Sequence, residues 1–290
     1  MQREQLRKVA DLALGYTLLV ILWGAFVRAT GSGAGCGSHW PACNAEVVPR
    51  EPTVATLIEF THRITSGLAL LAVVAVVVVA RKVAPPGASA RRFAYLSLFF
   101  MLTEAAVGAG LVLFEKVAHD ASIGRAYWMG AHLINTLFLV GSMTLTSYAA
   151  RHEQGRVRAS LERRGALLLA AAFILMLLVG VTGAVAALGD TLFPATSLAE
   201  GLRADFDPAS HPFIRLRATH PFLATACALV IIALSGYFQR SRDAATARTA
   251  RWVGALALGQ LAVGALHLVG PAPVAAQTLP LRAADARGSG

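Results

Sequence analysis

The chain has 290 residues, of which 56% are hydrophobic and only 14% are charged, and its mean hydropathy is +0.59. This balance excludes an ordinary soluble domain and indicates an integral membrane protein. The formal net charge of +10 fits either a nucleic-acid-binding protein or a membrane protein with basic cytoplasmic loops, and the positions of the charges decide between the two.

Apolar runs of about 17 to 25 residues are long enough to cross a bilayer as helices. Seven such runs follow one another, so the sequence predicts an all-α polytopic membrane protein. They are residues 12–27, 60–80, 93–114, 128–149, 166–188, 219–238 and 252–270. The first run has a basic start, but no small-residue cleavage site follows it, so we interpret it as an uncleaved span and not as a signal peptide.

The basic residues give the expected orientation. With the N-terminus in the cytoplasm, 16 of the 26 Lys and Arg residues fall in the inner segments, whereas the outer loops hold about as many acids as bases. The positive-inside rule therefore predicts a multi-pass protein of the cytoplasmic (inner) membrane and removes nucleic acid as a partner. The segment TGSGAGCGSHWPACNAE, residues 30–46, then lies outside, where oxidation favours a disulfide between Cys36 and Cys43.

The chain also contains an internal repeat. THRITSGLALL around His62 resembles THPFLATACAL around His220, 158 positions later. AAVGAGLVL resembles LAVGALHLV, with Gly108 and Gly264 in register at an offset of 156. Two matches in order at nearly one offset predict two four-helix halves. The halves are residues 1–150 and 165–290, and the second is expected to have three spans, because the segment after Gly270 is short and interrupted by prolines.

Three histidines share a depth near the outer ends of alternate predicted spans: His62, His132 and His220. Ionisable groups inside a span are costly and mark function, and neutral imidazole is the usual axial ligand of haem iron. Facing helices of a bundle can hold a macrocycle between two histidines, so these three are predicted iron ligands. His267 matches Leu111 of the first half and is left out of the set. The remaining histidines, His39, His119, His152 and His211, are expected in solvated loops.

Two carboxylates lie in the predicted spans. Glu59 precedes His62 by three residues and shares its helical face. There it could orient the imidazole, act as an acid or base, or stabilise positive charge in a substrate. It could also be a helix N-terminal acid favoured by the dipole. Glu104 lies near the middle of a span, where a carboxyl group is either protonated or paired, and its role stays open.

Two arginines flank the outer ends of the first two spans. Arg28 and Arg63 could pair with haem propionates or extend their charged ends to the membrane interface.

Together, GAFVRATGSGAGCGSHWPAC, IEFTHR, GAHLINT, GVTGAVAALGDTLFP and ATHPF resemble the haem A synthase family, the bacterial relatives of the mitochondrial cytochrome oxidase assembly factor that makes haem A. The resemblance runs from about Leu12 to Gln277. It implies an oxidoreductase of two pseudosymmetric four-helix bundles. Such an enzyme oxidises a methyl group of haem O to a formyl group by successive hydroxylation, giving haem A for terminal oxidases.

The resemblance also implies roles for residues of the first half. This half would hold the substrate, haem O, with His62 and His132 at the iron and Glu59 as the catalytic carboxylate. Cys36 and Cys43 match the paired outer cysteines of the family, which form a disulfide.

For the second half the resemblance implies a haem B cofactor held by His220 and by a histidine of an eighth span. That span commonly opens with a Gln-x-x-His segment in the family. Here the tail reads QTLP, which puts Pro280 at the histidine position. We therefore expect one ligand and one helix to be absent, and the cofactor of this half to be weakly bound or lost.

The expected partners are the lipid bilayer, haem O with the farnesyltransferase that produces it, and terminal oxidase assembly factors. The oxidant, the electron donor and a homo-oligomeric state stay open. The alternative function is a b-type membrane cytochrome or haem-binding assembly factor, which would use the same histidines without chemistry on the ring. A transporter with a carboxylate and histidine proton relay is a third class, but the sequence lacks the broken midplane helices of such folds.

Overall fold

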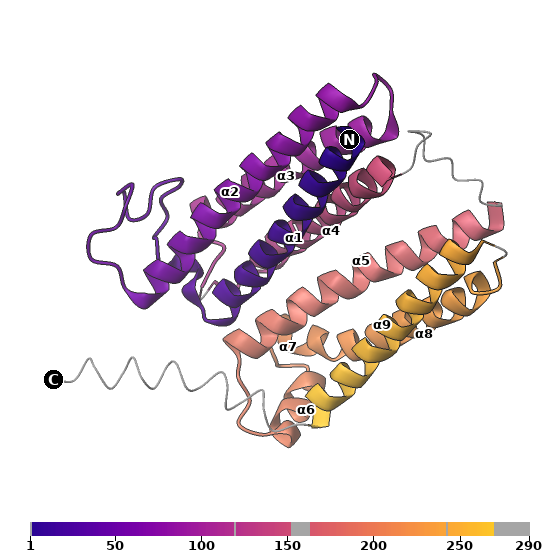
Figure 1. The fold of residues 1–290 in the computed structure, drawn as a ribbon. Helices are drawn as coiled ribbons and strands as arrows, with labels where there is room; N and C mark the ends of the chain where they lie inside the picture. Colours follow the sequence, from indigo (N-terminus) through magenta and orange to yellow (C-terminus); the bar gives the residue numbers. More distant parts are fainter. Residues whose placement is uncertain (1, 119, 152–162, 242, 270–290) are drawn as a thin grey trace. The chain divides into compact units, whose positions relative to one another are not determined.

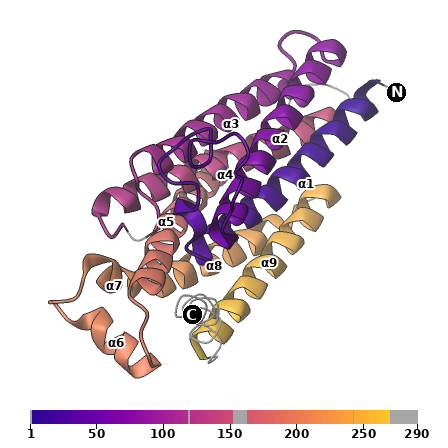
Figure 2. The same cartoon turned by 90° about the vertical axis from the view of Figure 1, so that its left-hand side faces the viewer.

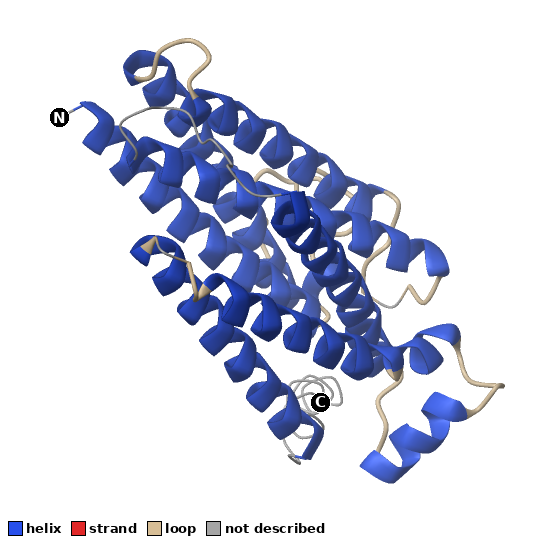
Figure 3. Cartoon of the chain, turned by 90° about the vertical axis from the view of Figure 1, so that its right-hand side faces the viewer, coloured by secondary structure: helices blue, strands red, loops and turns tan. Residues whose placement is uncertain are grey.

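The computed structural model describes residues 2–118, 120–151, 163–241 and 243–269, and this part of the chain is helical without a regular strand (Figures 1 and 3). It contains seven candidate membrane spans by length and composition. They are formed by α1 (Gln2–Ala29), α2 (Val54–Val83), α3 (Ser89–Leu113), α4 (Ile123–Arg151), α5 (Arg163–Leu192), α8 (Thr219–Phe238) and α9 (Ala244–Val269). The predicted all-α multi-pass fold is confirmed.

Most of these helices extend beyond the apolar runs from which they were predicted. α1 begins at Gln2 rather than near Leu12, and α4 begins at Ile123 rather than near Trp128. Hydropathy falls at the first charged residues, but the backbone hydrogen bonds of a helix continue through them. In the first turns of α1, for example, Arg7 donates to the side chain of Glu4 three residues earlier.

The N-terminal compact unit, Met1–Ala159, is here called unit 1. Helix α1 packs against α2 and α4, and α3 packs against the same two helices, so the four close into a bundle with α2 and α4 on its diagonal (Figures 1 and 2). We call the end where α1 leads into α2, and α3 into α4, the loop end.

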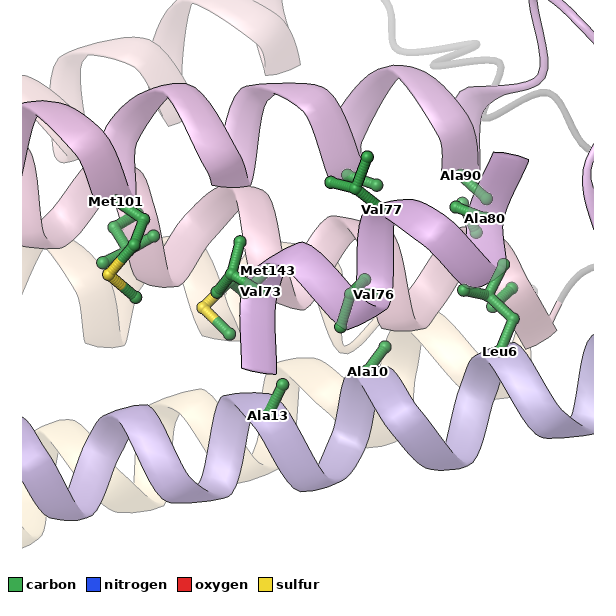
Figure 4. Close-up of a cluster of buried hydrophobic side chains, with 14 of the residues drawn as sticks. Leu6, Ala10, Ala13, Val73, Val76, Val77, Ala80, Ala90, Met101 and Met143 are labelled. Carbon is green, nitrogen blue, oxygen red and sulfur yellow. The ribbon is translucent and has the colours of Figure 1, made fainter. Parts of the chain in front are cut away.

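The core of unit 1 lies toward the opposite end. Figure 4 shows Leu6 of α1 near Ala80 of α2, and Val73 of α2 together with Met143 of α4 further along the same cluster. Small side chains such as alanine let membrane helices approach closely, which strengthens their van der Waals contact. Polar side chains also occur in this region, where Ser97 lies 3.4 Å from Thr146 and Asp11 pairs with Arg151.

The C-terminal compact unit, Ser160–Gly290, is here called unit 2. Helices α5 and α9 both pack against α8, which repeats the packing of α1 and α3 against α2. The expected absence of an eighth span concerns residues after Gly270, which lie outside the described residues.

Two short helices, α6 (Leu198–Phe206) and α7 (Pro212–Arg217), lie between α5 and α8 in the chain. Ser197 caps α6, since its hydroxyl accepts from the Glu200 amide at 3.2 Å. The expectation that His211 is solvated was wrong, because it caps α7 and its ring contacts Phe193 and Phe213. A histidine directly before a helix that starts with proline is fixed by that helix.

Candidate functional site

His62 and His132 lie on the diagonal helices of unit 1, each a few turns from the loop end. Their rings are close enough to interact electrostatically. The Nδ1 atom of each ring is buried, and neither has a hydrogen-bond partner in the described part of the chain. A buried polar atom left without a partner costs about 1–3 kcal/mol, so these two ring nitrogens are unusual inside the bundle.

A glycine of a neighbouring helix faces each predicted ligand. A Cβ atom on Gly24 of α1 would lie 2.9 Å from Cε1 of His62, and one on Gly183 of α5 would lie 2.9 Å from Cε1 of His220. Gly108 of α3 faces His132 in the same way, at 3.7 Å. The missing Cβ atoms let the rings of His62 and His220 pack directly against the backbone of the neighbouring helix.

Glu59 does not face His62 alone, because its carboxylate is 4% exposed and engaged with other groups. Its Oε2 accepts from the Cys36 amide at 2.9 Å, and its Oε1 accepts from Nε of Arg63 at 3.1 Å. The described contacts show a role that the sequence alternatives did not include, a carboxylate that holds the loop.

Arg63 also attaches the loop to α2. Besides Glu59, its Nη1 donates to the carbonyl oxygens of His39 and Ala42, each at 2.6 Å. These donors face the loop, so the expected contact with a haem propionate would need Arg63 to release at least one of them.

The loop of residues 30–53 is docked onto the first turns of α2. The sulfur atoms of Cys36 and Cys43 lie side by side, and both residues are fully buried. The hydroxyl of Thr56 donates to the Gly35 carbonyl at 2.8 Å. A Cβ atom on Gly35 would overlap the carbonyl group of Ala55, so only glycine allows this approach.

Arg125, in the first turn of α4, is a candidate that sequence reasoning missed. It is 5% exposed, and its Nη1 donates to the carbonyls of Ala118 at 2.5 Å and Asp120 at 2.9 Å. Its Nε atom has no hydrogen-bond partner among the described residues. Arg125 falls just before the predicted span 128–149, and a cation at a span edge is usually an interfacial residue, so hydropathy offers no signal of its burial.

The connection that Arg125 holds contains a second charge pair, between Lys116 and Asp120 at 3.3 Å. Burial raises the pKa of the Asp120 carboxyl, but hydrogen bonds from Ser122 and Lys116 outweigh it and bring the pKa below its ordinary value. Asp120 is therefore a carboxylate at neutral pH, and its ion pair with Lys116 holds the segment between α3 and α4 together.

Arg28 ends α1 at the loop end and is close enough to Arg125 for their charges to act on each other. Two guanidinium groups that repel one another are stabilised by a shared anion, and guanidinium binds carboxylates through paired hydrogen bonds. The loop end of unit 1 thus combines two histidines with two cations.

Glu104 is paired and not isolated, which settles one alternative from the sequence. Asn135 of α4 donates to its Oε2 at 2.5 Å, and Thr136 donates to its Oε1. The same Oε1 lies 3.3 Å from Nδ1 of His132, although no formed hydrogen bond satisfies that nitrogen. This network arises from the register of α3 against α4, which sequence spacing does not reveal.

In unit 2, Nδ1 of His220 lies 3.3 Å from the hydroxyl of Thr182. His267 belongs to the last turn of α9, and the surroundings of its side chain are not described. Arg217 forms ion pairs with Asp190 at 3.0 Å and Asp205 at 2.6 Å, where unit 1 has its cysteine loop.

Comparison with known proteins places these features in context. The family model of COX15-CtaA, described as cytochrome oxidase assembly protein, matches residues 7–281. A protoheme IX farnesyltransferase of Thermus thermophilus is 45% identical over 270 residues, which is 92% of this chain and 44% of the relative. The chain therefore spans less than half of that relative.

Shorter matches link the chain to proteins named heme A synthase. The one from Exiguobacterium sp. is 35% identical over 99 residues, 34% of this chain and 33% of the relative. The one from Bacillus cereus is 40% identical over 100 residues, 34% of this chain and 32% of the relative.

Proposed function

Because this chain belongs to the COX15-CtaA family of cytochrome oxidase assembly proteins, we propose that it is a haem A synthase-like oxidoreductase. Unit 1 binds haem O as substrate, with His62 and His132 as axial ligands, and a methyl group of the ring is oxidised to a formyl group by successive hydroxylation. The observation that carries this proposal is the pair of half-buried imidazoles that α2 and α4 bring together on the bundle diagonal.

The residues of the loop end fit a haem. Gly24 lets the His62 ring pack against the backbone of α1, and the cations Arg28 and Arg125 suit the propionate carboxylates. When bound, the haem iron supplies the oxidising chemistry, while the chain fixes its axial positions and orients the ring. Glu59, held by Arg63 and the loop amide, is the acid–base group one turn from His62.

We propose further that His220 holds a haem B cofactor in unit 2. In this scheme unit 2 passes electrons and unit 1 carries out the chemistry on the ring. The partners are the farnesyltransferase that supplies haem O and the assembly factors that receive haem A.

The proposed location is the inner membrane, with the N-terminus in the cytoplasm and the loop end outside. The distribution of Lys and Arg supports this orientation. On the outer face Cys36 and Cys43 oxidise to a disulfide, and the adjacency of their sulfur atoms supports this pairing. Reporter fusions after Arg151 and within residues 30–53 test the orientation, and an outer position of Arg151 contradicts it.

The decisive experiment measures haem composition in cells that supply haem O but lack their own haem A synthase. The wild-type chain is expected to give haem A, and His62→Ala or His132→Ala to abolish it. The matched control is His39→Ala, since that side chain is exposed and only its backbone carbonyl is used. Normal haem A from either ligand variant refutes the proposal.

The alternative is a b-type cytochrome or haem-binding assembly factor without ring chemistry. One observation favours it: the Glu59 carboxylate is taken up by the loop and Arg63. The variant Glu59→Gln separates the two, because it keeps the side-chain shape and removes the carboxylate. Retained haem with no haem A in this variant supports the oxidoreductase with Glu59 in the reaction. A wild-type chain that binds haem but forms no haem A in these cells supports the alternative.

The Thermus relatives are named for farnesyl transfer to protohaem, which would give haem O as product. That chemistry needs a prenyl diphosphate, whose Mg²⁺ is usually held by clustered carboxylates. The described residues contain no group of three or more His, Cys, Asp or Glu side chains able to hold a metal ion. Cells that supply only protohaem provide the test, because accumulation of haem O there would assign the transferase activity to this chain.

A further inference from the structure

Glu104 is the most constrained carboxylate inside unit 1. It projects from α3 toward α4, and its side chain is 16% exposed. Asn135 donates to Oε2 at 2.5 Å and Thr136 donates to Oε1. Both oxygens therefore have hydrogen-bond partners, and these contacts hold the carboxyl group in one orientation.

Asn135, which donates to Glu104, makes two further hydrogen bonds. Its Nδ2 also donates to the Phe100 carbonyl at 2.8 Å, and its Oδ1 accepts from the Thr103 hydroxyl at 2.6 Å. These contacts connect α3 to α4, which share the largest helix interface of the described chain. The carboxylate is thus placed before any ligand arrives, which is how supporting residues fix a functional group.

This placement aims one oxygen at His132. Oε1 of Glu104 lies 3.3 Å from Nδ1 of the ring, and a small rotation of the imidazole converts the contact into an N–H···O hydrogen bond. A carboxylate that accepts from one ring nitrogen fixes the tautomer, so the other nitrogen presents its lone pair to a metal. It also increases the electron density on the ligand and favours the oxidised metal ion.

The internal repeat places a different residue at the position of Glu104 in the second half. At the offset of 156 that relates Gly108 to Gly264, the counterpart of Glu104 is Gln260, a neutral amide on α9. Its side chain is exposed. One half of the molecule therefore carries a half-buried carboxyl group at this position, and the other half carries an exposed amide.

We propose that Glu104 is a positioning residue for His132, which sets the tautomer of this ligand and lowers the reduction potential of the haem in unit 1. The inference rests on the proposed function, since it requires His132 to bind haem iron. The Glu104 to Gln260 difference then distinguishes the half that carries out oxidation from the half that transfers electrons.

The experiment uses the purified full chain in a His220→Ala background, so that only the haem of unit 1 absorbs light. Glu104→Gln keeps the shape and the hydrogen-bonding groups but removes the charge. We expect it to retain haem and to change the ferric-to-ferrous ratio at a given potential at least tenfold toward ferrous, a positive shift of about 59 mV for one electron. Glu104→Leu also loses the contact to the ring, and we expect loss of most of the haem.

The matched control is Glu115→Gln, which removes the same charge from an exposed residue just after α3. Its potential should equal that of the parent. An unchanged potential in Glu104→Gln, or an equal shift in both variants, overturns the inference. If His62→Ala and His132→Ala keep their haem in the same background, the proposed function fails instead, so the two failures are distinct.

Discussion

At the residue scale, the contact between a glycine and an imidazole recurs in both units. Gly24 faces His62 and Gly183 faces His220, each with 2.9 Å between a built Cβ and the ring. The histidines are 158 positions apart in the sequence, so the repeat includes the glycine that packs against the ring as well as the ring.

We predict that Gly24→Ala lowers the haem content several-fold with little loss of stability. The added methyl group meets the end of a side chain that can rotate, so the ring moves away and the fold tolerates the change. Absorbance per chain and thermal unfolding measure the two effects. Gly15→Ala on the same helix is the control, because it meets no atom within 4 Å, and full haem content in Gly24→Ala would show that the ring position is unimportant.

Two ion pairs of unit 1 differ in burial, and their predicted contributions differ accordingly. The side chains of Arg63 and Glu59 are 12% and 5% exposed, whereas those of Arg151 and Asp11 are 50% and 34% exposed. Arg63→Met leaves a buried carboxylate unpaired and should cost about 3–5 kcal/mol. Asp11→Asn should cost at most about 1 kcal/mol.

Unfolding of the detergent-solubilised protein measures both values. Combining Arg63→Met with Glu59→Gln removes the uncompensated charge and should recover part of the loss. If the double variant is as unstable as the sum of the single variants, the pair is not coupled and the argument from burial is wrong.

At the element scale, the docked loop depends on a close backbone approach. A Cβ on Gly35 would overlap both the carbonyl carbon and the oxygen of Ala55, and backbone atoms cannot move aside as a side chain does. We predict that Gly35→Ala releases the loop. Trypsin should then cut after Arg50, whose side chain is 89% exposed, at least several-fold faster than in the parent.

Gly33→Ala is the control for this prediction, because its Cβ would meet Val117 at an ordinary 3.5 Å. Equal cleavage rates in the two variants would mean that the contact between Gly35 and α2 does not hold the loop.

The long helices could be predicted from hydropathy, but α6 and α7 could not. They are short and carry charged residues, so no apolar run announces them. A local signal did exist, since Ser197 and Glu200 have the spacing of a capping box. The Ser197 hydroxyl accepts from the Glu200 amide as that motif requires, while the Glu200 carboxylate accepts from the amide of Thr196, one residue earlier. His211 followed by Pro212 was a second signal, because proline favours the first turn of a helix.

At the scale of the whole molecule, the two halves of the repeat share their helix packing but differ in their polar residues. Helices α5, α8 and α9 pack in the order of α1, α2 and α3. Yet the position after the first histidine is Arg63 in one half and Pro221 in the other, and Glu104 corresponds to Gln260. Apolar contacts determine the fold in both halves, so the polar positions were free to diverge.

We predict that this divergence appears in haem content. His62→Ala should remove most of the haem from the full chain, whereas His220→Ala should remove only a minor part, since the described residues bring two predicted histidine ligands together in unit 1. Pigment extraction with protein quantification gives the ratio. A larger loss in His220→Ala than in His62→Ala would reverse the assignment of the stronger site.

The candidate site could be predicted only in part. Histidines at one depth on alternate spans are visible in the sequence, because depth follows from position within an apolar run. Partners across helices are not visible. Glu59 faces the loop and not His62 alone, Arg125 is buried, and Glu104 meets Asn135, because each contact depends on helix rotation and register. These are tertiary properties, which spacing along one helix does not determine.

The attachment of the loop to α2 also bears on the order of events during synthesis. The bonds from the loop to Glu59 and Arg63 join residues separated by only 21 to 24 positions, and local contacts form early. The His62 side of the pocket can therefore assemble while the ribosome is still translating α3. His132 emerges much later, so capture of the macrocycle must wait until α4 has entered the membrane.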